Sequence, residues 1–154
     1  RGLVLNANYT RVWSETAFPF HTSKTFYDYT TWPITITRTY EEHERRGTMP
    51  GQSAHIFNVS LGYDIGGFSA RASVMYQSKS LHQVGKIPEA DSWNNDFWRY
   101  DASVKYRLNK MVSFYANFMN ISGQPDRGYY GSEVYQTNIY YYGMTANLGV
   151  QVNF

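Results

Sequence analysis

Residues 142–154 read Tyr-Gly-Met-Thr-Ala-Asn-Leu-Gly-Val-Gln-Val-Asn-Phe, and this stretch decides the fold class. Every second residue is apolar, and the residues between them are glycine or polar. An unbroken period of two is typical of a β-strand with one apolar face and one polar face. The stretch closes on an aromatic residue, whereas chain ends are usually polar and frayed. A membrane β-barrel accounts for both features, because its strands alternate over roughly 10 residues and carry aromatic side chains at the membrane interface.

The composition favours one β-rich domain and excludes several classes of function. The chain has 154 residues, of which 18% are aromatic, and 15 of them are tyrosines. Tyrosine suits strands and also membrane boundaries, where one end of its ring is dry and the other wet. A net charge of +2 without a basic stripe argues against nucleic acid as a partner. Cysteine is absent, which excludes thiolate metal sites, and no apolar run approaches the ~18 residues of a spanning helix.

The same alternation recurs along the chain and predicts an antiparallel sheet. Further strands are expected at residues 3–13, 56–64, 68–77, 97–106 and 112–119, and the last strand is expected to begin between Thr137 and Tyr142. Long polar connections are expected at residues 14–53, 79–96 and 120–136. Within the first of them, the Ile-Thr-Ile-Thr alternation of Trp32–Tyr40 indicates some strand. Long and short links alternate, as in outer-membrane barrels with long external loops and short periplasmic turns.

We therefore expect about six strands of a larger antiparallel transmembrane β-barrel. The apolar stripes carry no charge between their ends, and aromatic residues gather at the ends of the stripes. The residues expected to face lipid are Phe57, Val59, Leu61, Ala70, Ala72, Val74, Ala102, Val104, Leu148 and Val150. A soluble β-sandwich has the same alternation and remains the competing fold, as a carbohydrate-binding module that uses its aromatic residues.

Residues 147–154 resemble the β-signal of outer-membrane barrels, in which a polar residue, a glycine, a hydrophobic residue and a final aromatic residue are spaced in this way. The residues that carry this resemblance are Asn147, Gly149, Val152 and Phe154. Residues 114–121 and 124–131 are similar to the penultimate strand and last external loop of TonB-dependent outer-membrane receptors, and residues 49–63 fit the same family.

The resemblance implies that residues 1–154 are the C-terminal part of a receptor barrel domain, without its plug and earlier strands. Members of the family have roughly 22 strands and a plugged lumen, and Arg1 is expected to begin a processed or partial product. The implied function is energised uptake of a scarce ligand, such as a ferric chelate, a cobalamin or an oligosaccharide. The implied location is the bacterial cell outer membrane, with the C-terminus at the periplasmic side. The implied partners are lipid, the rest of the barrel, the plug, the TonB complex and the barrel assembly machinery.

The sequence offers no catalytic residues, cofactor or metal site, because the four histidines lack ligand spacing and His43 lies within a mixed charged run. Candidate ligand contacts come from the polar strand faces and the long connections, where arginine favours anionic groups and aromatic rings desolvate a ligand. These candidates are Arg71, Arg99, Asp101 and Lys105 on the expected lumen face, and Trp93, Arg127, Tyr129 and Tyr130 in the connections. The same charges also serve simply to solvate a lumen, and a passive outer-membrane pore remains an alternative function.

Overall fold

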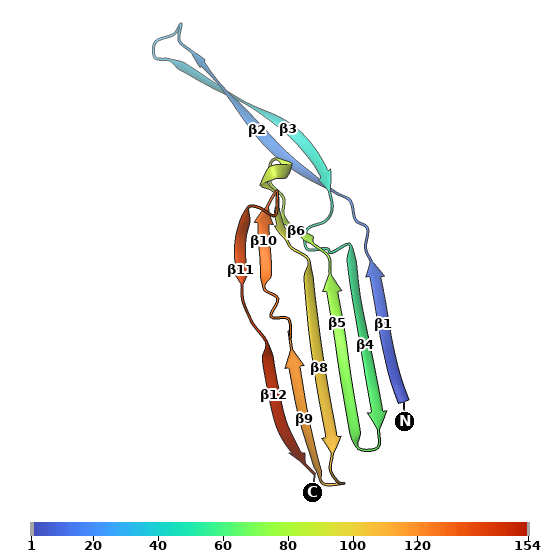
Figure 1. Cartoon of the computed structure of the whole chain (residues 1–154). Coiled ribbons are helices and arrows are strands. Elements are labelled where there is room, and N and C mark those ends of the chain that lie inside the picture. Colours follow the sequence, from blue (N-terminus) through green and yellow to red (C-terminus); the bar gives the residue numbers. More distant parts are fainter. Residues whose placement is uncertain (1, 154) are drawn as a thin grey trace. The chain divides into compact units, whose positions relative to one another are not determined.

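The computed structural model describes residues 2–153, whose regular structure is antiparallel β apart from one short 3-10 helix. Six strands lie side by side in what we name the main sheet (Figure 1). In order across the sheet they are β1 (Gly2–Arg11), β4 (His55–Ile65), β5 (Phe68–Gln77), β8 (Phe97–Arg107), β9 (Val112–Met119) and β12 (Thr145–Val152). Within the described residues β1 and β12 each pair on one side only, so the main sheet is open. The expected antiparallel all-β fold is confirmed, and the first five predicted strands lie where the sequence pattern placed them.

Glycine makes the tightest link of the main sheet. The register pairs Ile65 with Phe68, so that only Gly66 and Gly67 turn the chain from β4 into β5. Gly66 has a φ of 57°, a conformation that glycine adopts without steric cost. A two-residue link fixes the pairing of the two strands, whereas a slip by one residue would turn every side chain to the other face.

The register brings the predicted apolar stripes together on one side of the main sheet, which we name the apolar face. Leu61 lies opposite Leu5 on β1 and Ala72 on β5. In the same row, Ala102 lies between Ala72 and Phe118. Directly opposed residues of antiparallel strands point to the same side, so the stripes form one continuous surface. The other predicted members that share this face are Phe57, Val59, Ala70, Val74, Val104, Leu148 and Val150.

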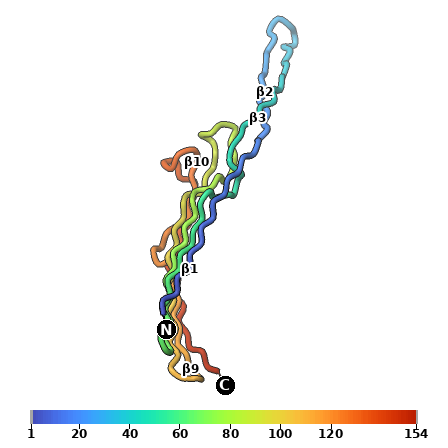
Figure 2. Tube along the Cα trace, turned by 90° about the vertical axis from the view of Figure 1, so that its right-hand side faces the viewer, coloured from blue at the N-terminus to red at the C-terminus, as the bar shows by residue number. Residues whose placement is uncertain are grey.

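The apolar face lies open in the part of the chain that the structure describes. Leu61 is 50% exposed and Leu148 is 70% exposed. Among the described residues, the buried hydrophobic side chains are Leu81 and Tyr129, and both lie outside the main sheet. Figure 2 shows the main sheet from its side, as a single layer of strands. The main sheet therefore has no apolar interior of its own.

The prediction for the start of the last strand was wrong. β12 begins at Thr145, after Gly143 with a φ of 66°. The Asn120 side chain donates to the Gly143 carbonyl oxygen at 3.0 Å, which holds the chain at this break. At the other end the Asn153 N–H donates to the Met111 carbonyl oxygen at 2.8 Å, so β12 ends beside the short β8–β9 link, as the alternation of links predicts. Phe154 lies outside the described residues.

Two of the three long connections contain the short strands β6, β7 and β10, which the sequence did not predict, and a fourth short strand, β11, covers residues where the last strand was expected to begin. These strands pair into a second sheet, named here the loop sheet, in the order β11 (Gln136–Tyr140), β10 (Asp126–Tyr130), β7 (Ser92–Asn94) and β6 (Ser80–Gln83). A 3-10 turn, Pro88–Ala90, lies between β6 and β7. The strands escaped prediction because three to five residues are too few for an alternation to stand out. In Figure 2, β10 lies to one side of the main-sheet layer.

The first long connection forms a separate compact unit, Trp13–Met49, which we name the hairpin. Its strands β2 (Thr16–Asp28) and β3 (Thr35–Gly47) pair without a register shift. At the tip the Asp28 carboxylate accepts from the Thr30 N–H at 2.9 Å and from the Thr30 hydroxyl at 2.6 Å. These bonds lower the pKa of Asp28. The prediction of some strand in Trp32–Tyr40 is confirmed from Thr35 onward, although the expected long loop is a ladder for most of its length.

Candidate ligand-binding groove

The opposite side of the main sheet, its polar face, carries charged groups that largely satisfy one another. The Arg71 guanidinium binds both carboxylate oxygens of Asp64, at 2.9 and 2.6 Å. A bidentate pair of this kind fixes the geometry of both groups. The Arg71 side chain lies over Gly62, where a Cβ atom would be 2.5 Å from Arg71 Cδ, so glycine makes room for it. The Lys105 ammonium donates to Gln151 Oε1 at 3.2 Å.

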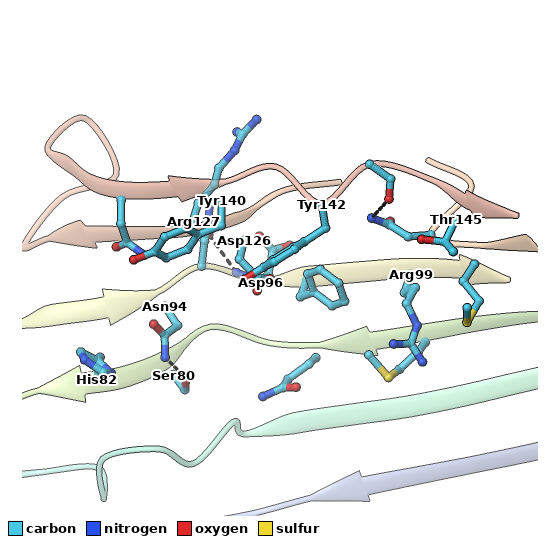
Figure 3. Close-up of a pocket in the computed structure, with 18 of the residues that line it drawn as sticks. Ser80, His82, Asn94, Asp96, Arg99, Asp126, Arg127, Tyr140, Tyr142 and Thr145 are labelled. Carbon is cyan, nitrogen blue, oxygen red and sulfur yellow. Dashed lines mark hydrogen bonds between the residues drawn. The ribbon is translucent and has the colours of Figure 1, made fainter. Parts of the chain in front are cut away.

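A cavity of about 840 Å³ lies between the polar face and the loop sheet, and we name it the groove. The main sheet contributes Met75, Gln77, Phe97, Arg99 and Met119 to its lining. The loop sheet contributes Ser80, His82, Ser92, Asn94, Asp126, Arg127, Asn138 and Tyr140 (Figure 3). Its volume is in the range of roughly 300–1,000 Å³ that is usual for ligand sites in proteins. The groove therefore has the size of a small-molecule site.

Cross-strand register explains which side of the loop sheet meets the groove. Asn94 lies opposite Ser80 on one side and Gly128 on the other, and Gly128 lies opposite Asn138. Ser80, Asn94 and Asn138 all line the groove, so this row forms its wall. The neighbouring row, Leu81, Trp93 and Tyr129, alternates to the other side of the loop sheet. The apolar residues thereby hold the wall in place and leave its polar residues for a ligand.

Buried contacts on the far side keep the loop sheet together. Leu81 is 3% exposed and Tyr129 is 4% exposed. Burial raises the pKa of the Tyr129 phenol, and the negative charges of Glu133 and Asp96 raise it further. The buried Asp91 accepts from the Gly85 N–H at 2.8 Å through its carboxylate, and from the Gly131 N–H at 2.8 Å through its carbonyl oxygen. These bonds tie the 3-10 turn to the segment after β10.

Asn120 joins the main sheet to the groove. It follows β9 with a φ of 52°, a left-handed conformation that Asn tolerates better than most residues. Its N–H donates to Asp101 Oδ1 at 2.9 Å, and the other oxygen of that carboxylate accepts from Arg99 Nε at 3.1 Å. The side-chain oxygen of Asn120 is buried and has no hydrogen-bond partner among the described residues. Since buried polar atoms are nearly always paired, this oxygen is an exception that a hydrogen-bond donor would satisfy.

The structure brings together only part of the predicted set of ligand contacts. Arg99 and Arg127 line the groove, but Figure 3 draws the Arg127 side chain pointing away from the other labelled residues. Arg71 and Asp101 line a separate cavity of about 260 Å³ on the polar face. The remaining candidates do not line the groove: Lys105 lies on β8, and Trp93, Tyr129 and Tyr130 lie on the loop sheet.

Several lining residues were missed by the sequence analysis. They include Asp96, Asp126, Tyr140 and Tyr142, which Figure 3 draws near one another, between Asn94 and Arg99. The only sequence signal for them was the alternation of polar residues within short runs, and this signal depends on knowing which runs are strands. Among the described residues no group of three or more His, Cys, Asp or Glu side chains is placed to hold a metal ion.

The predicted assembly signal lies on both faces of β12. The strand pattern puts Asn147 and Gly149 on the polar face and Val152 on the apolar face. Gly149 lies opposite Tyr115, and a Cβ atom at this position would overlap the Tyr115 ring. Gly149 therefore has a packing role, whether or not it is also read during assembly. The fourth residue of the predicted signal, Phe154, lies outside the described residues.

No model of a known protein family matches the chain, and no solved structure matches it either. In the described residues, no helix is long and apolar enough to cross a membrane.

Proposed function

We propose that the chain forms part of the wall of a bacterial outer-membrane β-barrel and takes part in the uptake of a polar ligand. The apolar face would contact lipid, and the polar face and groove would contact the ligand. The single observation that carries this proposal is the continuous, exposed apolar face, because one side of the main sheet is formed by apolar residues and the sheet has no interior to bury them in.

The energetics support a non-aqueous neighbour for this face. Burial of apolar surface contributes about 25 cal/mol per Å², and soluble monomers rarely expose apolar patches larger than a few hundred Å². Exposed apolar side chains occur on each strand of the sheet, from Leu5 on β1 to Leu148 on β12. Lipid satisfies such a face without any further protein layer, and in the proposed barrel other strands would pair the outer edges of β1 and β12, as the hydrocarbon region requires.

The more specific form of the proposal is a TonB-dependent receptor. It rests on the resemblance of the last strands to that family. It rests also on the arrangement of the links, with the long links at one end of the strands and the short links at the other. In this form the loop sheet and hairpin are external, β12 ends at the periplasmic side, and a plug and the TonB complex supply energised transport. A passive pore is the alternative, and single-channel conductance distinguishes the two, because an open pore conducts without a plug or TonB.

A pair of neighbouring positions tests the lipid assignment. Leu61 and Ser60 are adjacent on β4 and point to opposite faces. Tryptophan would be placed at one position or the other, with the four native tryptophans replaced by phenylalanine. After reconstitution into vesicles of brominated phosphatidylcholine, we expect strong quenching of the fluorescence from Leu61→Trp and weak quenching from Ser60→Trp.

Equal quenching at the two positions would contradict the proposal. A protein that stays monodisperse in buffer without detergent, with neither position quenched, would favour the soluble β-sandwich.

A further inference from the structure

We infer that the groove selects a ligand with a primary ammonium group on a neutral, hydrogen-bonding body, and that it disfavours anionic ligands. The inference rests on the proposed function, since it concerns the ligand of the same site. It reverses the preference for anions that the arginines of the sequence suggest.

The cationic side chains near the groove are not available to an anion. The Arg99 guanidinium donates to the Asp101 carboxylate at 3.1 Å, so a negative charge already offsets its positive charge. The Arg127 side chain points away from the groove in Figure 3. Its neighbour Asp126 faces the other way, because successive residues of a strand alternate. Neither arginine therefore gives the groove a net positive potential.

Two carboxylates remain without a cationic partner among the described residues, those of Asp96 and Asp126. The Asn95 N–H donates to the Arg127 carbonyl oxygen at 2.9 Å, which brings the neighbouring Asp96 and Asp126 to the same part of the groove. Like charges at such a position repel, and a bound cation relieves that repulsion. Charge-assisted hydrogen bonds from an ammonium group to carboxylates are about twice as strong as neutral ones.

Aromatic rings complete the surroundings of a cation in this part of the groove. Tyr140 lies directly opposite Asp126 in the register of β10 and β11. The rings of Tyr140 and Tyr142 have centroids 6.5 Å apart, and both residues line the groove. A cation is attracted to the face of a tyrosine ring. Carboxylates beside aromatic rings therefore favour an ammonium group over a hydrated anion.

An unsatisfied polar group points independently to a ligand. Asn120 lines the groove, and its buried side-chain oxygen has no hydrogen-bond partner among the described residues. This oxygen accepts hydrogen bonds, so it suits an N–H donor. The amides of Gln77, Asn94 and Asn138 line the same cavity and suit a neutral body with donors and acceptors.

Isothermal titration with three capped tetrapeptides tests the inference on the full chain in detergent micelles. The probes are tetralysine, tetraglutamine and tetraglutamate, which share a backbone and differ in charge. We expect tetralysine to bind at least about tenfold more tightly than tetraglutamine, and tetraglutamate to bind least. Asp96→Asn and Asp126→Asn should each weaken tetralysine binding about tenfold. Glu133→Gln is the control. It removes a carboxylate of the β10–β11 link that does not line the groove, and it should leave tetralysine binding unchanged.

Tetraglutamate binding as tight as tetralysine binding would overturn the inference, and so would tetralysine binding that neither asparagine variant weakens. Binding of calcium chloride without binding of tetralysine would also overturn it, in favour of a metal site. These outcomes are independent of the lipid test. Quenching at position 61 without a preference for lysine rejects only the ligand class, whereas a preference for lysine without quenching rejects only the membrane assignment.

Discussion

The main sheet leaves its apolar side chains exposed, whereas the loop sheet buries its own. The main sheet joins its six strands in the order in which they occur along the chain, and its apolar side chains stay exposed, as Leu61 does. The loop sheet joins β7 and β10, which are separated in the chain by β8 and β9, and it buries Leu81 and Tyr129. The difference teaches that the loop sheet supplies its own interior, whereas the main sheet has no interior in which to bury its apolar residues.

The largest effect should come from emptying the interior of the loop sheet. Leu81→Ala removes a side chain that is 3% exposed, and large-to-small changes at buried sites cost about 2–5 kcal/mol. We expect amide hydrogen exchange to accelerate in β6, β7 and β10 while the main sheet stays protected. Leu61→Ala is the matched control, and it should change protection by less than about 0.5 kcal/mol because its side chain is not enclosed. Equal effects of the two substitutions would remove the distinction between the sheets.

Charge on the apolar face should have the next largest effect. Ala102 is central in its row, and Ala102→Arg in lipid should destabilise the chain by about 2–4 kcal/mol if it lies near the midplane. Ser103→Arg is the control on the polar face, where charged residues already occur. Urea titration of protein reconstituted into vesicles measures both changes. Similar losses at the two positions would contradict a lipid-facing role for this side of the sheet.

Packing at the assembly signal provides a smaller and sharper test. Gly149→Ala forces the Tyr115 ring to move, and overpacking of this kind costs about 1–3 kcal/mol. In the double variant with Tyr115→Ala the overlap disappears, so we expect stability to be largely restored. The amount of folded protein in outer-membrane fractions would be measured in parallel. A double variant that is stable once folded but still poorly assembled would assign Gly149 to the signal rather than to packing.

The smallest effect concerns alkaline pH at the loop sheet. The pKa of the buried Tyr129 phenol is raised, so the folded chain holds its proton more tightly than the unfolded chain. The resulting stabilisation is intact below the ordinary tyrosine pKa of about 10, and it is lost as pH rises through the higher folded-state pKa. Proteinase K should cut the loop sheet faster above this range. Tyr129→Phe, which cannot ionise, should show a weaker rise, and an identical rise in both proteins would contradict this account.

Only part of the candidate site was predictable from the sequence, namely the residues that lie on long strands. Arg99 was predicted because it belongs to a long alternating strand, whose polar face follows directly from its period. Asp126 and Tyr140 were missed because they belong to five-residue strands whose pairing is not encoded in either strand alone. Arg127 was predicted on charge, but strand alternation turns its side chain away from the groove (Figure 3).

The sequence by itself determined the strands of the main sheet, apart from the start of β12, and the face that each residue shares. It did so because period-two alternation is a local feature, and a short link pairs β4 with β5 and β8 with β9. Only the tertiary structure decided that the long connections pair into a loop sheet, and that Asp96 and Asp126 meet in the groove. The physical reason is that these contacts join segments separated by whole strands, so their stability comes from burial of Leu81 and Tyr129 rather than from any local pattern.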